Sequence, residues 1–146
     1  MSGAPPTLSV IVPTLNEAAR IATLIDAVRA QDPNCEIIVV DGGSADNTPQ
    51  IASASGARVL DSVPGRGQQV AAGADAASGD ILLFLHADSR LPGGALAAIR
   101  DACADRPGAQ GGNFRLLFDG GTRFDYWLNG FYAFIRARGC YYGDSG

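Results

Sequence analysis

Four short apolar runs alternate with helical patterns before residue 105, and this alternation limits the folds open to the chain. The runs are four or five residues long and span residues 8–12, 37–40, 57–60 and 81–85. The first two runs are typical of strands that are buried on both faces. Strands that alternate with helices form parallel sheets covered by helices. The sequence therefore predicts an α/β fold, with a parallel or mixed sheet flanked by helices.

The segments between the runs carry helical signals. Four apolar residues after the first run have the spacing i, i+3, i+4, i+7 that lines one helix face. They are Ile21, Leu24, Ile25 and Val28. Asn16 is a candidate N-cap for this helix, because its side chain can accept a hydrogen bond from a free backbone N–H group. Further helices are predicted from Thr48 onward and over residues 67–77 and 94–104.

Polar, acidic and glycine-rich residues follow every one of the four runs. The segments PTLNE, DGGSAD, PGRG and HAD begin at Pro13, Asp41, Pro64 and His86. The carboxyl ends of parallel strands meet at one edge of the sheet, and open α/β sheets bind ligands there. Turn chemistry alone accounts for one or two such segments. Four of them on one edge favour a ligand site.

Charge and composition exclude several classes of protein. The chain has 146 residues and a formal net charge of −4, which argues against a nucleic-acid partner, since phosphate contacts need a basic face. All eleven basic residues are arginine. Without lysine, a Walker A phosphate loop and a lysine Schiff base are both excluded. Three scattered cysteines and a single histidine do not form a zinc-binding pattern.

The pattern changes after Pro107. Residues 111–118 predict a strand with a glycine-weakened start, and residues 123–138 predict a helix rich in aromatic side chains. This helix either packs on the core or lines an apolar acceptor groove or a membrane surface. Residues 122–138 are accordingly a candidate for peripheral membrane contact. The first ten residues lack the basic and apolar regions of a signal peptide, so we expect a cytoplasmic location, with the inner face of the membrane as the surface such contact would use.

Four segments, taken together, resemble the family 2 glycosyltransferases. They are LSVIVPTLNE, IIVVDGGSADNT, GRGQQVAAGADAASGDILLFLHADSRLP and YYGDSG. The closest resemblance is to a bacterial subgroup with H-A-D where many relatives have D-x-D, which includes arsenosugar-biosynthesis glycosyltransferases. The resemblance implies a single domain with a GT-A fold, in which residues 1–107 form the nucleotide-sugar-binding half and residues 108–146 part of the acceptor half. It also implies that the family continues beyond this chain, so that the acceptor half is incomplete.

The resemblance further implies transfer of a sugar from a nucleotide diphosphate donor, usually UDP, to an acceptor that the sequence does not identify. It places Asp88 on a divalent metal, Mg²⁺ or Mn²⁺, and it makes Asp144 the catalytic base. Thr14, Glu17 and Asp41 would contact the base and ribose, and Arg66 the base or the diphosphate. The full set of implied donor-binding residues is Pro13, Thr14, Glu17, Asp41, Gly43, Ser44, Arg66, His86 and Asp88.

General chemistry agrees with these roles. Mg²⁺ and Mn²⁺ prefer carboxylate oxygens, and one or two of them suffice when diphosphate oxygens complete the shell. His86 stands where many relatives have the first aspartate, and a neutral imidazole is a poor ligand for Mg²⁺. We therefore expect His86 to hydrogen-bond the ribose or to orient Asp88, with a buried histidine beside a turn aspartate as the structural alternative. A single base, Asp144, is consistent with an inverting displacement.

Two other functions stay open at this point. The chain could be a nucleotide-sugar-binding piece without catalytic activity, because the acceptor half is expected to be incomplete. A nucleotidyltransferase shares the same placement of ligands at strand ends, but it would require a phosphate-binding cation after the first strand. The segment PTLNE has no basic residue.

Overall fold

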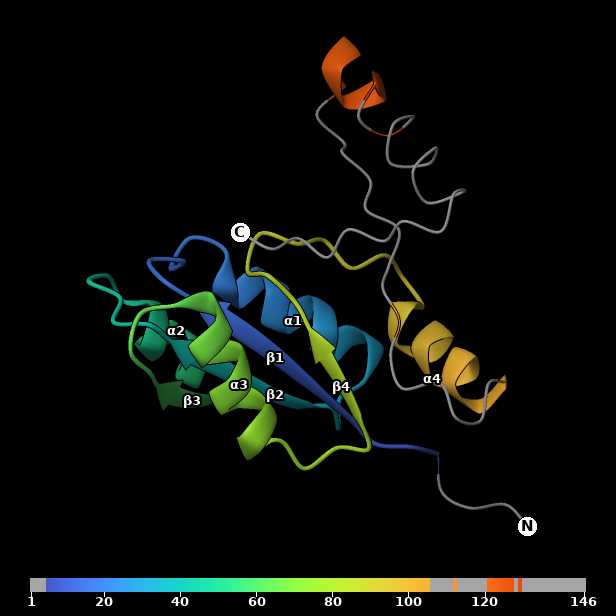
Figure 1. Cartoon of the computed structure of the whole chain (residues 1–146), viewed down its shortest axis with the longest axis horizontal. Coiled ribbons are helices and arrows are strands. Elements are labelled where there is room, and N and C mark those ends of the chain that lie inside the picture. The colour runs from blue at the N-terminus through green and yellow to red at the C-terminus, as the bar shows by residue number, and fades with distance from the viewer. Residues whose placement is uncertain (1–4, 106–111, 113–120, 128, 130–146) are drawn as a thin grey trace. The chain divides into compact units, whose positions relative to one another are not determined.

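The structure is a computed structural model of the whole chain, and it describes residues 5–105, 112, 121–127 and 129. The chain divides into two compact units, Met1–Asp105 and Arg106–Gly146 (Figure 1). Each unit is described by itself. The first contains the sheet and the helices that determine where a ligand can bind.

Four parallel strands form the sheet of the first unit, in the order β3-β2-β1-β4. They are β1 (Leu8–Thr14), β2 (Glu36–Asp41), β3 (Arg58–Asp61) and β4 (Ile81–Phe84). The chain moves outward from β1 to β3 and then crosses back to place β4 on the other side of β1. The strand order thus reverses between β1 and β4, and open parallel sheets bind ligands beyond the carboxyl ends at such a point.

Helices cover both faces of this sheet, as the alternation predicts. They are α1 (Ile21–Gln31), α2 (Thr48–Ala54), α3 (Arg66–Ala76) and α4 (Ala95–Asp105). One apolar cluster joins side chains of β1 and β2, such as Val10 and Val39, to α1, α2 and α4. A second cluster joins Ile11 and Ile38 to alanines of α3. Figure 1 shows α3 (green) on one side of β1 and β2, and α1 (blue) on the other.

The central strand is buried on both faces, which explains its continuous apolar sequence. Val10, Ile11 and Val12 have no exposed surface. On one side the contact is especially close, because Gly73 of α3 lies against β1. A Cβ atom on Gly73 would clash with Ile11 Cγ2 and lie 3.1 Å from Val40 Cγ2. The glycine therefore allows α3 to approach the two strands whose ends form the candidate site.

The predicted cap of the first helix is wrong. α1 begins at Ile21, and its N-cap position is Arg20, which makes no side-chain capping bond. Asn16 instead lies in the loop before the helix with a φ of 58°, a left-handed conformation that asparagine tolerates better than most residues. Its side chain accepts a hydrogen bond from the distant Ala45 N–H group at 2.8 Å. A tertiary contact has thus replaced the local cap.

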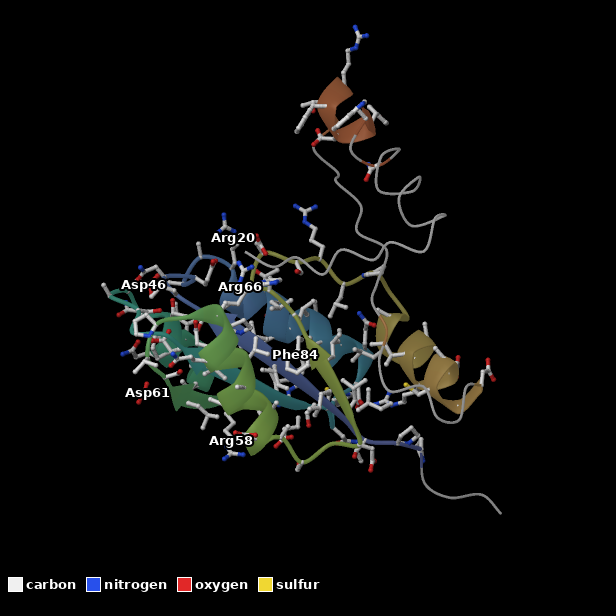
Figure 2. All side chains as sticks on the ribbon, viewed as in Figure 1. Arg20, Asp46, Arg58, Asp61, Arg66 and Phe84 are labelled. Atoms are coloured by element: carbon white, nitrogen blue, oxygen red, sulfur yellow. The ribbon has the colours of Figure 1, made fainter. Side chains whose placement is uncertain are left out.

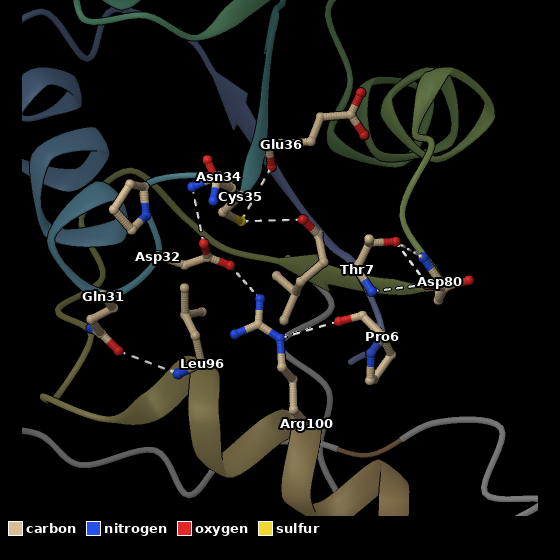
Figure 3. Close-up of polar contacts among 12 residues, drawn as sticks. Pro6, Thr7, Gln31, Asp32, Asn34, Cys35, Glu36, Asp80, Leu96 and Arg100 are labelled. Atoms are coloured by element: carbon tan, nitrogen blue, oxygen red, sulfur yellow. Dashed lines mark hydrogen bonds and ion pairs between the residues drawn. The ribbon is translucent and has the colours of Figure 1, made fainter. Parts of the chain in front are cut away.

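Polar contacts hold α4 to the end of α1, as Figure 3 shows. Arg100 pairs with Asp32 and donates from Nε to the Pro6 carbonyl at 3.2 Å. The hydrogen bond from Arg100 to the Asp32 carboxylate is the main reason why the pKa of Asp32 lies below its usual value. Gln31 Oε1 accepts from the Leu96 N–H group at 3.2 Å. These contacts lie at the amino edge of the sheet, away from the carboxyl ends of β1 and β2.

The described part of the second unit is short. Residues 123–127 and 129 are helical, in agreement with the predicted start of a helix at Arg123. Thr122 and Asp125 form a reciprocal capping box, in which Thr122 N donates to Asp125 Oδ2 at 2.9 Å and Asp125 N to Thr122 Oγ1 at 3.2 Å. The Phe124 and Trp127 rings stack with centroids 6.0 Å apart. Apart from Gly112, which is in no helix or strand, the predicted strand over 111–118 and the end of the predicted helix lie outside the described residues.

None of the helices in the described ranges is long and apolar enough to cross a membrane.

Candidate functional site

The carboxyl ends of the strands bring three polar residues into one row. Thr14 is paired in register with Asp41, and Asp41 with Asp61. On the other side of β1, the Leu85 N–H group donates to the Ile11 carbonyl at 3.0 Å, so the chain stays beside β1 as far as Leu85. The HAD segment begins at the next residue. The loops after all four strands therefore leave the sheet at the same edge.

Asp41 is the centre of a tight turn after β2. Its side chain is almost fully buried, with 3% of the residue exposed. Oδ2 accepts from the N–H groups of Gly43 at 3.0 Å and Ser44 at 2.8 Å. Oδ1 accepts from Ser44 Oγ at 2.5 Å and lies 3.2 Å from the donating Thr14 Oγ1. A carboxylate has about four acceptor positions, so the protein itself fills those of Asp41.

The loop after β1 is joined to the loop after β2 by a reciprocal pair of hydrogen bonds. Asn16 N donates to Ser44 Oγ at 2.8 Å, and Ala45 N donates to Asn16 Oδ1 at 2.8 Å. Ser44 therefore accepts from one loop while it donates to Asp41. These contacts give Ser44 a structural role in addition to the donor-binding role predicted for it.

A second set of contacts joins the same loops closer to the helices. Glu17 N donates to Thr48 Oγ1 at 2.8 Å, and Ala18 N donates to Asp46 Oδ2 at 3.1 Å. Asp46 also accepts from the Thr48 hydroxyl and, at 3.0 Å, from Thr48 N. These bonds, the Thr48 hydroxyl above all, hold the pKa of Asp46 below its usual value. The Glu17 carboxylate pairs with Arg20 at 3.1 Å.

The HAD segment forms a turn of a different kind after β4. Ser89 N donates to the His86 carbonyl at 3.0 Å and closes the turn. Ala87 is buried at 6% exposure and packs in the apolar cluster with α1 and α4. Asp88 is exposed, and its carboxylate makes no hydrogen bond or ion pair within the described part of the chain. His86 is half-buried. The turn is thus anchored by the alanine and presents the aspartate to solvent.

Arg66 is the first residue of α3 and is exposed. The first turn of this helix carries no acidic residue, so an arginine side chain and a helix N-terminus favour anions at the same place. Figure 2 shows Arg20, Asp46 and Arg66 along one edge of this unit, whereas Arg58, at the start of β3, lies toward the opposite edge.

A metal ion at this edge would have few protein ligands. Within the ranges that the structure describes, no three His, Cys, Asp or Glu side chains converge in a way that could hold a metal. Asp88 is the exposed carboxylate beside the reversal of the strand order. Its environment fits a cation that is shared with a phosphate-bearing ligand and does not fit a site made of protein ligands alone.

The structure adds Gln69 and Asp61 to the residues predicted from the sequence. Gln69 lies in α3, is 5% exposed and donates to backbone carbonyls of β1 and β2. Asp61 ends β3 and lines an open depression between that strand and α2. Gln69 was missed because its partners are far away in sequence, whereas Asp61 could have been found as the acidic residue directly after the run 57–60. The predicted base Asp144 lies outside the described residues.

A parallel sheet whose order reverses beside polar loops is an open α/β sheet, a class that binds ligands beyond the carboxyl ends of its strands. A family model agrees with this class and makes it more specific. The model described as Glycosyl transferase family 2 matches residues 9–141, and the chain belongs to this family.

Two curated relatives come from mycobacteria. Glucosyl-3-phosphoglycerate synthase of Mycobacterium tuberculosis is 39% identical over 93 residues, which cover 56% of this chain and 29% of that protein. The PGL/p-HBAD biosynthesis glycosyltransferase of Mycobacterium bovis is 38% identical over 96 residues, which cover 60% of this chain and 38% of that protein. The chain thus spans less than two fifths of the length of either relative.

Solved structures of the Mycobacterium tuberculosis synthase are similar to this chain. One contains Mn²⁺, UDP and glucosyl-3-phosphoglycerate; it is 36% identical, with a TM-score of 0.55, over 65% of this chain and 38% of that chain. Another contains Mg²⁺ and UDP, with the same identity, TM-score and coverage. The predicted GT-A-like fold is confirmed by this similarity and by the observed parallel sheet.

Proposed function

We propose that this chain binds a nucleotide diphosphate sugar, with UDP as the nucleotide, and belongs to a glycosyltransferase that moves the sugar to an acceptor. The observation that carries the proposal is the exposed Asp88 carboxylate beside the strand reversal, at the edge formed by two joined polar loops. Support also comes from the related synthase, whose structures contain UDP together with Mn²⁺ or Mg²⁺.

The base and ribose would lie against the loops after β1 and β2. Pro13 and Thr14 are the last residues of β1, Glu17 lies in the loop that follows it, and Gly43 and Ser44 lie in the loop after β2. Gly43 has a φ of 91°, and no atom lies within 4 Å of the place where its Cβ would be. A planar base can therefore approach the backbone there.

Asp41 would border the base while holding the turn that receives it. Its oxygens are already occupied by Thr14, Gly43 and Ser44. The contribution of Asp41 to donor binding is thus largely the fixed position of these neighbours, since a preorganised site loses less entropy on binding.

The diphosphate and the metal would lie between β4 and the start of α3. Asp88 would hold Mg²⁺ or Mn²⁺ together with diphosphate oxygens, and His86 would hydrogen-bond the ribose or orient Asp88 from behind. When bound, such a cation neutralises the negative charge of the departing nucleotide diphosphate. Arg66 and the N-terminus of α3 would add positive charge on the same leaving group.

The acceptor side of the proposal rests on sequence. Asp144 would take a proton from the acceptor hydroxyl, as expected for an inverting transfer with one general base. Replacing Asp144 by asparagine should abolish transfer and leave donor affinity nearly intact. Loss of donor affinity at an unchanged transfer rate would contradict this role. Residues 122–138 as a membrane contact, and a cytoplasmic location, stay predictions.

Calorimetry with a panel of nucleotides tests the proposed function. We expect UDP and a UDP-sugar to bind in the presence of Mn²⁺ at least roughly tenfold more tightly than ADP or GDP, a difference of about 1.4 kcal/mol. A folded chain that binds no uridine nucleotide, or that binds all nucleotides equally, would contradict the proposal.

A further inference from the structure

Gln69 is a buried polar side chain that connects three elements of the first unit. It lies in α3, and its Nε2 donates to the Thr14 carbonyl at 2.8 Å and to the Val40 carbonyl at 2.8 Å. Thr14 is the last residue of β1, and Val40 is the second-last residue of β2, just before Asp41. A side-chain amide has two N–H donors, and both are used here on main-chain acceptors of neighbouring strands. One helical residue therefore fixes two strand ends.

The same side chain fills the space beside the turn that Asp41 closes. The Gly42 N–H group donates to the Thr14 carbonyl at 2.9 Å, so this carbonyl accepts from both Gly42 and Gln69. A Cβ atom on Gly42 would lie only 3.0 Å from Gln69 Nε2 and 3.1 Å from Gln69 Cδ. Gly42 and Gln69 are thus matched in size. The first peptide of the turn can lie where it does because position 42 has no side chain.

Gln69 also links this turn to the start of α3. Its own N–H group donates to the Gly65 carbonyl at 3.0 Å, as part of the first turn of the helix that Arg66 begins. In the proposed function, Arg66 lies at the diphosphate and the turn closed by Asp41 lies at the base. The amide of Gln69 is a direct polar link between the two segments that would hold opposite ends of the nucleotide.

We propose that Gln69 is a positioning residue for the donor nucleotide, which fixes the start of α3 and Arg66 relative to the Asp41 turn. This inference rests on the proposed function, and it assigns Gln69 no contact with the donor. Because misplacing a binding group by about 1 Å can cost a large part of its effect, loss of the link should weaken donor binding even though every contacting side chain is still present.

The test compares Gln69→Met with Gln68→Met in the whole chain. Methionine keeps the length of the side chain and removes both N–H donors, and Gln68 is an exposed neighbour on the same helix. We expect Gln69→Met to fold, by circular dichroism, and to lower UDP affinity in the presence of Mn²⁺ by roughly tenfold or more. We expect the Gln68→Met affinity to stay within about twofold of wild type, as for a surface substitution.

A double-mutant cycle separates positioning from a general loss of stability. If Gln69 positions Arg66, the Arg66→Ala substitution should reduce UDP affinity less in the Gln69→Met background than in the wild-type chain. Hydrogen exchange of the Gly43 and Ser44 amides should also become faster in Gln69→Met without any nucleotide. If Gln69→Met does not fold, Gln69→Leu replaces it in both measurements.

Each outcome has one meaning. If the wild-type chain binds UDP and Gln69→Met binds it with the same affinity, the positioning role is wrong and the proposed function stays intact. Additive losses in the cycle would overturn the link to Arg66, and with it the inference. If the wild-type chain does not bind UDP, the proposed function fails, and the positioning role fails with it.

Discussion

Two aspartates at the carboxyl edge of the sheet have opposite environments in this fold. Asp41, the last residue of β2, is 3% exposed and accepts hydrogen bonds from Thr14, Gly43 and Ser44. Asp88, after β4, is exposed and makes no hydrogen bond or ion pair in the described part of the chain. A carboxylate at the end of a strand can therefore either build the site or remain available to a ligand. We assign the first role to Asp41 and the second to Asp88.

The residues next to each aspartate explain the difference. After Asp41, two glycines and a serine let the backbone turn back, so that its N–H groups reach the carboxylate. Before Asp88, the small residue Ala87 is buried in the apolar cluster and anchors the turn. The aspartate that follows it is left on the solvent side.

Removal of the buried carboxylate should have the largest effect on stability. Asp41→Ala removes the acceptor of the hydrogen bonds from Gly43 N, Ser44 N and the Ser44 hydroxyl, and a hydrogen bond to a charged group contributes about 1.5–3 kcal/mol. We expect the free energy of unfolding, measured with urea, to fall by roughly 3 kcal/mol, and UDP affinity to fall with it. A loss below about 1 kcal/mol would show that the turn does not depend on Asp41.

Glu36, at the amino edge of the sheet, tests whether a hydrogen-bonded carboxylate can stabilise the fold without affecting UDP binding. Glu36 accepts from Ser9 Oγ at 2.5 Å and from Ser78 N at 2.8 Å, and the Ser9 hydrogen bond is the main reason why its pKa is lowered. We expect Glu36→Gln to lower the free energy of unfolding by about 1–2 kcal/mol. UDP affinity should not change, because this edge carries none of the proposed donor residues. A large loss of affinity would contradict the separation.

The lowered pKa of Glu36 also fixes the direction of its pH dependence. A carboxyl group whose pKa is lower in the folded state contributes stability above its unfolded pKa, about 4.3 for glutamate, and loses it as the pH falls through the folded value. The wild-type chain should therefore lose stability between neutral pH and acid more steeply than Glu36→Gln. Parallel pH profiles of the two proteins would rule out this contribution.

Ser44→Ala should have a smaller effect on stability than either carboxylate substitution. The serine hydroxyl donates to Asp41 and accepts from Asn16 N, so alanine removes one donor and one acceptor from the joined loops. We expect a loss of about 1 kcal/mol in the free energy of unfolding, together with faster hydrogen exchange at Asn16. Unchanged exchange at Asn16 would mean that the reciprocal link between the loops is not formed in solution.

The sequence predicts the strands and helices well, because their periodic patterns are local. The four strands and α1–α4 lie within a few residues of their predicted positions, and the GT-A-like sheet follows from them. Asn16 is the instructive failure, since an asparagine before a helix has the sequence of a cap. Its actual partner, Ala45, lies 29 residues away, and no local pattern reports such a contact.

The candidate site divides in the same way. The strand-end positions of Asp41 and Asp88 follow from the apolar runs, but their burial depends on the neighbouring turns. The role of Gln69 depends on acceptors 55 and 29 residues away in Thr14 and Val40. Sequence therefore locates the edge of the sheet where the proposed site lies, whereas the pairing of each polar group needs the three-dimensional structure.

Asp88 should contribute almost nothing to stability, in contrast to Asp41. An exposed side chain without partners changes the free energy of unfolding by no more than about 0.5 kcal/mol when it is replaced by alanine. This is the smallest effect we expect from any of these substitutions. A loss of several kcal/mol would show that Asp88 is part of the structure and would weaken its assignment to a metal.

The most direct test of the account is the dependence of UDP binding on Mn²⁺ in Asp88→Ala. Calorimetry of the wild-type chain should give tighter UDP binding with Mn²⁺ than without it, and Asp75→Ala, an exposed aspartate near the far end of α3, should behave in the same way. Asp88→Ala should bind UDP with the same affinity in the presence and absence of Mn²⁺. If Mn²⁺ still strengthens UDP binding in Asp88→Ala but no longer does so in His86→Ala, the metal lies on the histidine and the assignment of Asp88 is wrong.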